Sequence, residues 1–129
     1  AATQNDVNMD WAKKIAESGV KYYIEVANMP TTNEALEFLK GQKHMVVAPS
    51  KAVNACGVAV SELEMAQNAE RLYWTAEEVD TKMHAIMKNI YHNSVAAAER
   101  YGLGYDLVAG ANIVGFQKVA DAMMAQGIF

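Results

Sequence analysis

The chain has 129 residues, of which 52% are hydrophobic and 20% are charged. These values are typical of one globular domain that is large enough to bury a core. Eleven Lys and Arg against fifteen Asp and Glu give a formal net charge of −4, which excludes a general binder of nucleic acids or anionic membranes. A single cysteine, Cys56, excludes an internal disulfide and favours a reducing, cytoplasmic compartment. No apolar run approaches the roughly 18 residues of a membrane helix.

The first helix and the first strand are predicted near the start of the chain. Residues 8–18 suit a short helix, with Asp10 in its first turn and Gly19 as its stop. Residues 20–27 are rich in β-branched and aromatic side chains, which predicts a strand.

A second helix and a second strand follow. Thr31 and Glu34 have the spacing of a capping box, which predicts a helix that continues through Leu39 and ends at Gly41. Residues 45–48 form a short apolar run before a proline, as is typical of a buried parallel strand. The succession of strand, helix and strand predicts an α/β fold with parallel pairing across a helical crossover.

The remainder of the chain is helical in pattern. Apolar residues recur at helical spacing over residues 53–72. Thr75 and Glu78 form a second capping box, at the start of a long helix that ends near residues 101–104. A last helix is predicted over residues 107–126, with a glycine as its stop.

Two strands are few for a parallel sheet, which normally has more strands and is covered on both faces. We therefore expect further strands before residue 1. The polar start of the chain does not resemble a secretory signal and has no initiator Met, so we expect it to be a cut or designed boundary.

Five short stretches are more specific than any periodicity. They are residues 2–5 (ATQN), 27–32 (ANMPTT), 53–61 (VNACGVAVS), 64–68 (EMAQN) and 110–116 (GANIVGF). In this order and at this spacing they resemble the glutamate dehydrogenases of the small-subunit bacterial type, and the resemblance runs from the first residue to the last.

The resemblance implies reversible oxidative deamination of L-glutamate to 2-oxoglutarate and ammonia, with NAD or NADP as the hydride acceptor. It implies that residues 1–129 are the carboxyl-terminal part of a Rossmann-like cofactor domain, with a few parallel strands followed by long helices. The last helix, at about residues 105–129, would return toward the substrate domain, and the intact enzyme would be a homo-oligomer. The choice between the two cofactors stays open, because the residues that distinguish their ribose groups are expected upstream.

Five residues are candidates for binding by the same resemblance. Asn28 would hydrogen-bond the nicotinamide–ribose part of the cofactor; alternatively, it only organises the turn before the following proline. Ser61 would bind the side-chain carboxylate of glutamate; alternatively, its hydroxyl bonds back to its own helix backbone. Asn54, Gly57 and Val58 match positions that line the same substrate pocket, although Val58 also suits a core.

Two departures from the family affect the expected substrate pocket. The family usually has two glycines where this chain has Cys56-Gly57, and Ser-Gly where it has Ser61-Glu62. Cys56 adds bulk, and Glu62 adds negative charge beside the serine that would hold a carboxylate, so either change is expected to weaken glutamate binding.

Other features of the family are missing. The chain contains no Gly-x-Gly-x-x-Gly turn and no counterpart of the family's catalytic Lys and Asp. We therefore expect no catalytic residue in it and no activity from the isolated chain. No metal site is expected either, because His84 and His92 are eight residues apart and there is no second Cys. Lys51 is interpreted as a structural or surface residue. The alternative function is a non-enzymatic helical module that self-associates through its apolar faces.

Overall fold

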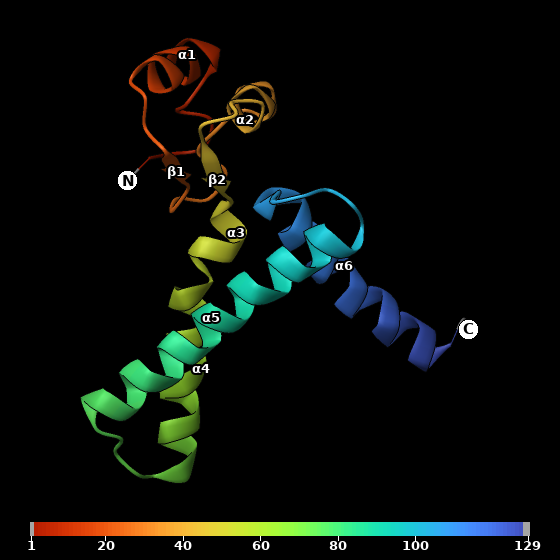
Figure 1. Ribbon diagram of the computed structural model, residues 1–129. Helices are drawn as coiled ribbons and strands as arrows, with labels where there is room; N and C mark the ends of the chain where they lie inside the picture. The colour runs from red at the N-terminus through yellow and green to blue at the C-terminus, as the bar shows by residue number, and fades with distance from the viewer. Residues whose placement is uncertain (1, 128–129) are drawn as a thin grey trace.

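The computed structural model describes residues 2–127, in which two parallel strands and three short helices precede three long helices (Figure 1). The elements are, in chain order, α1 (Met9–Glu17), β1 (Tyr22–Ile24), α2 (Asn33–Lys40), β2 (Val46–Ala48), α3 (Ser50–Val53), α4 (Ala55–Glu70), α5 (Ala76–Arg100) and α6 (Leu107–Gln126). The predicted α/β class, with parallel strands followed by long helices, is confirmed.

The two strands pair in parallel, and α2 is the crossover between them. Tyr22 lies opposite Val46, and Ile24 lies opposite Ala48. β1 is three residues long, whereas the sequence predicts a strand over residues 20–27. Its length follows that of β2, which also has three residues, because a strand persists only where a neighbour accepts its backbone hydrogen bonds.

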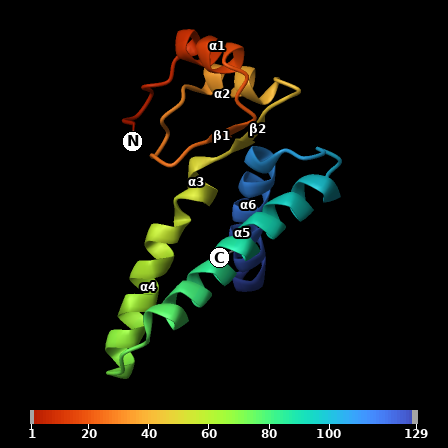
Figure 2. The same ribbon diagram turned by 60° about the vertical axis from the view of Figure 1, so that its left-hand side comes forward.

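Small and apolar side chains from four elements form the core of the α/β part. The buried members are Ala12, Ala35, Leu39, Met45, Val47 and Val108. Figures 1 and 2 both place α1 and α2 together on one side of the strands, and the start of α6 lies against β2. Leu39 is fully buried, which stabilises the fold by about 1.5–3 kcal/mol relative to exposure. Val108 joins α6 to the same core.

Local side-chain caps set the start of α1 and of α5. The Asn8 side chain accepts hydrogen bonds from the backbone N–H groups of Asp10 and Trp11 and so begins α1. Thr75 and Glu78 form the predicted capping box of α5, with each side chain bonded to the other residue's backbone N–H. The second capping box is therefore confirmed.

The prediction that Thr31 and Glu34 form a capping box at the start of α2 is wrong. Thr32 is the N-cap, and its hydroxyl accepts from the backbone N–H of Ala35 at 3.4 Å. Thr31 is buried, and its hydroxyl lies 2.7 Å from the hydroxyl of Tyr23, whose pKa is raised by burial. This tertiary contact uses the Thr31 side chain, so the helix begins one residue later and Glu34 loses its place in the box.

The helix predicted over residues 53–72 is confirmed as α4, and a short helix that the sequence did not predict, α3, precedes it. α3 follows β2 directly, the chain bends at Asn54 (φ −87°, ψ −1°), and α4 begins at the next residue. α4 and α5 form a helical hairpin, and α5 then packs on α6 (Figures 1 and 2). α5 and α6 have the bounds that the sequence predicts to within a few residues.

The backbones of α5 and α6 meet at Gly110. A Cβ atom at this position would lie 1.9 Å from the carbonyl oxygen of Ser94. Ser94, Ala97 and Ala98 are all buried on α5. These small residues allow the two helices to approach closely, and no side chain larger than hydrogen fits at Gly110 without displacing one of them.

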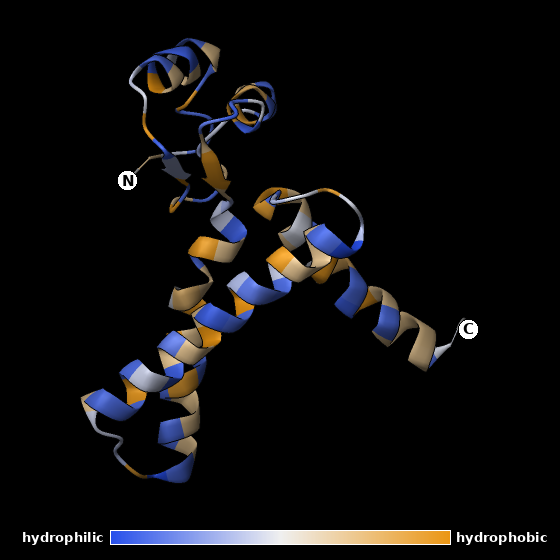
Figure 3. Cartoon of the chain, in the orientation of Figure 1, coloured by the Kyte–Doolittle hydropathy of each residue, from blue (hydrophilic) through white to orange (hydrophobic). Residues whose placement is uncertain are grey.

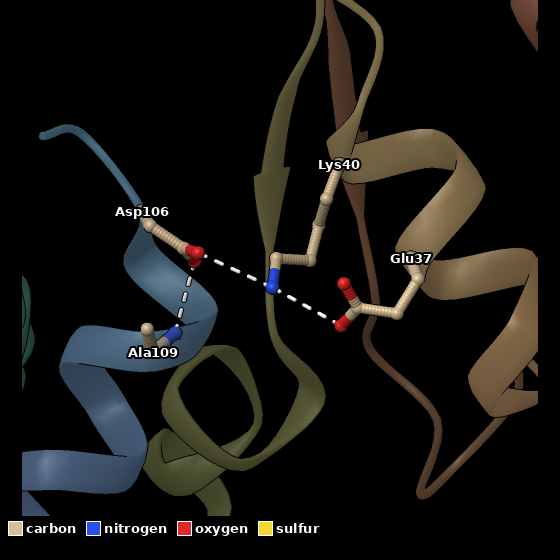
Figure 4. A network of polar contacts seen from close by, with 4 residues as sticks. All are labelled: Glu37, Lys40, Asp106 and Ala109. Atoms are coloured by element: carbon tan, nitrogen blue, oxygen red, sulfur yellow. Dashed lines mark hydrogen bonds and ion pairs between the residues drawn. The ribbon is translucent and has the colours of Figure 1, made fainter. Parts of the chain in front are cut away.

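An ion-pair network joins α2 to the start of α6 (Figure 4). Lys40 Nζ lies 3.1 Å from Glu37 Oε1 and 3.2 Å from Asp106 Oδ2. Asp106 is also the N-cap of α6, and its Oδ1 accepts from the backbone N–H of Ala109 at 2.9 Å. Burial alone would lower the pKa of Lys40, but the hydrogen bonds that Lys40 donates to the carboxylates of Glu37 and Asp106 outweigh it, so this pKa is raised.

The outer parts of the long helices expose apolar side chains. Figure 3 shows hydrophobic residues continuing along α6 beyond its contact with α5. Phe116 is 73% exposed and Met124 is 80% exposed, while Met65 on α4 is 71% exposed. Within residues 2–127, none of the helices combines the length and the apolar character needed to cross a bilayer.

Gly110→Ala is expected to destabilise the fold by about 1–3 kcal/mol, because the added methyl group overlaps the Ser94 carbonyl. Gly115→Ala is the matched control on the same helix, where a Cβ meets nothing within 4 Å. Ala is the better helix former by about 1 kcal/mol, so this control should be neutral or stabilising. Denaturant unfolding measures both changes, and equal effects from the two variants would contradict the close crossing.

Asp106→Ala removes both the cap of α6 and the partner of Lys40, and we expect it to lower the free energy of unfolding by about 0.5–2 kcal/mol. Asp106→Asn keeps a capping oxygen but loses the ion pair, so it should be less destabilising than the alanine variant. Thermal unfolding at low and at high salt compares them. The asparagine variant should differ least from the wild type at high salt, where ion pairs are screened.

Candidate functional site

The carboxyl ends of β1 and β2 lie at the same edge of the sheet, because the strands are parallel. The Glu25 N–H donates to the Ala48 carbonyl at 3.0 Å, and the Ser50 N–H donates to Oε2 of Glu25 at 3.2 Å. Glu25 is only 5% exposed. Its buried carboxylate therefore ties the end of β1 to the start of α3, and it holds together the two segments that carry the predicted site residues.

Asn28 and Asn54 meet at this edge. Nδ2 of Asn54 donates to the Val26 carbonyl at 3.0 Å and to Oδ1 of Asn28 at 2.6 Å. The two asparagines are 26 residues apart in the chain. Asn28 is exposed and Asn54 is half-buried. The structure thus brings the residue predicted to bind the cofactor into direct contact with one predicted to line the substrate pocket.

The other three predicted residues follow Asn54 along one face of α4. Gly57, Val58 and Ser61 lie three, four and seven residues beyond it, which is the spacing of a single helix face. All three are exposed, and Val58 is 66% exposed, so Val58 contributes to no core within residues 2–127. A Cβ atom at Gly57 would meet nothing within 4 Å, so the space over this face is open.

Ser61 makes the hydrogen bond to its own helix backbone that was given above as the alternative to binding glutamate. Its Oγ donates to the Gly57 carbonyl, one turn earlier in α4, at 3.1 Å. The residue is exposed, so the hydroxyl can rotate toward a ligand above the helix. A carboxylate is a stronger acceptor than a backbone carbonyl. Both roles of Ser61 are compatible with this geometry, and its binding role stays a prediction.

A cleft of about 1060 Å³ opens at the same edge of the sheet, between the amino-terminal segment, α2, α3 and α6. Its lining includes Gln4, Asn5, Glu25, Met29, Thr31, Ser50, Lys51 and Asn112. None of the five predicted site residues lines it. Asn28 precedes Met29 in the chain, so the predicted residues lie beside this cleft and the face of α4 continues away from it.

Lys51 and Asn112 both line the cleft, and the sequence predicted no binding role for either. Lys51 Nζ donates to Oδ1 of Asn112 and so links α3 to α6 across the cleft. Asn112 falls in the stretch at residues 110–116 that carries the family resemblance. This place in the stretch was the sequence signal that could have marked Asn112 as a candidate site residue. The bond agrees with the structural interpretation of Lys51.

Comparisons with known proteins all point to one family. The family of glutamate, leucine, phenylalanine and valine dehydrogenases matches residues 1–127. The chain is 75% identical over 127 residues to the NAD-specific glutamate dehydrogenase of Clostridium symbiosum, and 54% identical over 129 residues to the NADP-specific glutamate dehydrogenase of Escherichia coli. Each match covers 98% of this chain and 28% of the relative.

Solved structures agree with the sequence matches. A glutamate dehydrogenase that is 74% identical superposes with a TM-score of 0.95, over 99% of this chain and 28% of that one. The hetero-hexameric glutamate dehydrogenase of Thermus thermophilus, which is 26% identical, superposes with a TM-score of 0.89 over 100% of this chain and 30% of its own.

The chain thus spans little more than a quarter of the curated relatives that it matches, and it matches them along nearly its whole length. With the family match over residues 1–127, this similarity establishes that the chain belongs to the glutamate/leucine/phenylalanine/valine dehydrogenase family.

Proposed function

We propose that this chain is the carboxyl-terminal part of the cofactor domain of an NAD- or NADP-dependent glutamate dehydrogenase. The reaction is the reversible oxidative deamination of L-glutamate to 2-oxoglutarate and ammonia. The observation that carries the proposal is the contact between Asn28 and Asn54 at the carboxyl ends of two parallel strands. Ligands of open α/β sheets bind outside these strand ends. α6 is proposed to be the helix that returns toward the substrate domain.

The nicotinamide cofactor, when bound, supplies the hydride acceptor for the oxidation. Asn28 suits its nicotinamide–ribose end, because the residue is exposed, polar and held at the end of β1. The local donors and acceptors are amides, which match the hydroxyl and carboxamide groups at that end of the cofactor. The part of the site proposed here is therefore one that orients the cofactor, and proton transfer would depend on residues outside this chain.

The exposed face of α4 suits the substrate. Ser61 would donate its hydroxyl to the side-chain carboxylate of glutamate and leave its bond to the Gly57 carbonyl. The exchange favours the ligand, because a charge-assisted hydrogen bond is roughly twice as strong as a neutral one. Gly57 leaves open space beside it, and Val58 supplies an apolar surface for the methylene groups of the substrate.

The intact protein is proposed to be a cytoplasmic homo-oligomer. The Thermus thermophilus relative is named a hetero-hexamer, which supports assembly in the family. The exposed apolar residues of α4 and α6 provide surface for such contacts or for the rest of the chain. A non-enzymatic helical module is not favoured, because the relatives matched over nearly the whole chain are named as dehydrogenases.

The test is an assay of the intact enzyme for glutamate-dependent reduction of NAD⁺ or NADP⁺. Ser61→Ala should raise the KM for glutamate by roughly tenfold or more, since a hydrogen bond to a charged group contributes about 1.5–3 kcal/mol. Glu62→Gly should lower that KM, because it removes a negative charge next to the proposed carboxylate site. If no glutamate-dependent activity is found, the proposed function is wrong. If Ser61→Ala leaves the KM unchanged, the substrate role of Ser61 is wrong.

Gly57→Ala should separate the effects on stability and on binding. Ala is the better helix former by about 1 kcal/mol, and a Cβ at this position touches nothing within 4 Å, so the variant should unfold at a higher temperature. The same methyl group would project into the proposed glutamate site and raise the KM for glutamate. Gly115→Ala in α6 is the control, with a similar gain in stability and an unchanged KM. A Gly57→Ala enzyme with unaltered KM would show that the substrate does not approach this face.

A further inference from the structure

The side chain of Asn54 is used in an unusual way for its position. Asn54 is the N-cap residue of α4, and Asn is among the best residues for bonding the free N–H groups of a first turn. Its side chain makes no capping bond here. It reaches back instead to the loop after β1, where it contacts Val26 and Asn28.

The chemistry of these contacts fixes the orientation of both amides. The Val26 carbonyl can only accept a hydrogen bond, so Asn54 must present its NH2 group to it. The second hydrogen of that NH2 group then meets Asn28, which must present its oxygen, in a contact of 2.6 Å. The NH2 group of Asn28 consequently lies on the other side of its carboxamide, and the residue is exposed.

The loop that carries Asn28 is held from its other end as well. The Asn5 N–H donates to the Met29 carbonyl at 3.0 Å. Met29 adopts a positive φ of 48°, a conformation that is unfavourable for a residue other than glycine. The backbone of the turn is thus held on both sides of Asn28, and the hydrogen bond from Asn54 orients the Asn28 side chain.

We propose that Asn54 is a positioning residue that holds Asn28 as a hydrogen-bond donor toward the cofactor. The side chain of Asn28 then selects an acceptor, such as the carboxamide oxygen or a ribose hydroxyl oxygen at the nicotinamide end. This assignment rests on the proposed function and adds to it the direction of the hydrogen bond and the residue that enforces it. Asn54 acts through Asn28, and so its role in cofactor binding is separable from any contact with the substrate.

The test measures the dissociation constant of the reduced cofactor, NADH or NADPH, by fluorescence titration of the intact enzyme. Asn28→Ala, Asn54→Ala and the double variant are compared with Asn68→Ala, an exposed asparagine later in α4, as the control. The loss of one neutral hydrogen bond corresponds to roughly three- to tenfold weaker binding. Each single variant should show such a loss, the double variant should bind no more weakly than Asn28→Ala alone, and the control should bind normally. Multiplicative losses in the double variant would overturn the positioning role.

Asn28→Asp distinguishes donation from a merely structural contact. The aspartate still accepts from Asn54, so the unfolding temperature should be retained, but the donor toward the cofactor is gone and binding should weaken at least as much as in Asn28→Ala. Asn28→Asp with normal cofactor affinity would overturn the assignment of Asn28 as donor. If the unsubstituted enzyme shows no saturable binding of either reduced cofactor, the proposed function fails and this assignment fails with it.

Discussion

The parallel pairing of β1 with β2 is the constraint on which the rest of the structure depends. The crossover through α2 brings both strand ends to one edge, and the three-residue register fixes how they meet. Glu25 reinforces the junction from within, because its buried carboxylate accepts from the first residue of α3. With the strand ends held in this way, Asn28 and Asn54 come into contact although 26 residues separate them. An antiparallel arrangement would place them at opposite edges.

The long helices are joined to this sheet by small residues and by one charged network. Gly110 allows α6 to lie directly on the backbone of α5, and Val108, two residues earlier, enters the core beneath β2. Asp106 begins α6 and binds Lys40 of α2 with the same carboxylate (Figure 4). The position of α6 is therefore specified within a single helical turn, and the rest of the helix extends beyond the contact with its apolar residues exposed.

The proposed site has two parts, the loop after β1 and the exposed face of α4. The loop offers an exposed amide in a strained turn, and the helix offers a hydroxyl, a glycine and an aliphatic side chain on one face. Asn54 belongs to both, because its backbone begins α4 and its side chain holds the loop.

The sequence by itself determined the helices, their order and most of their ends. These features depend on hydrogen bonds and side-chain contacts within a few residues, as at Asn8 and in the capping box of Thr75 and Glu78. The family and the candidate site residues could also be predicted from the sequence, because five short stretches have the residue types, order and spacing that resemble the family.

Only the tertiary structure decided what the remaining polar side chains do. Thr31 has the sequence signature of a helix cap, yet it bonds to Tyr23, and Thr32 takes its place. Asn54 has the residue type of a cap and instead holds Asn28. Each of these side chains could form a hydrogen bond with a backbone group nearby in the sequence or with a partner far away in the sequence. The distant partner is selected when the strands pair, because pairing brings it within hydrogen-bonding distance, and no sequence pattern of short range contains that information.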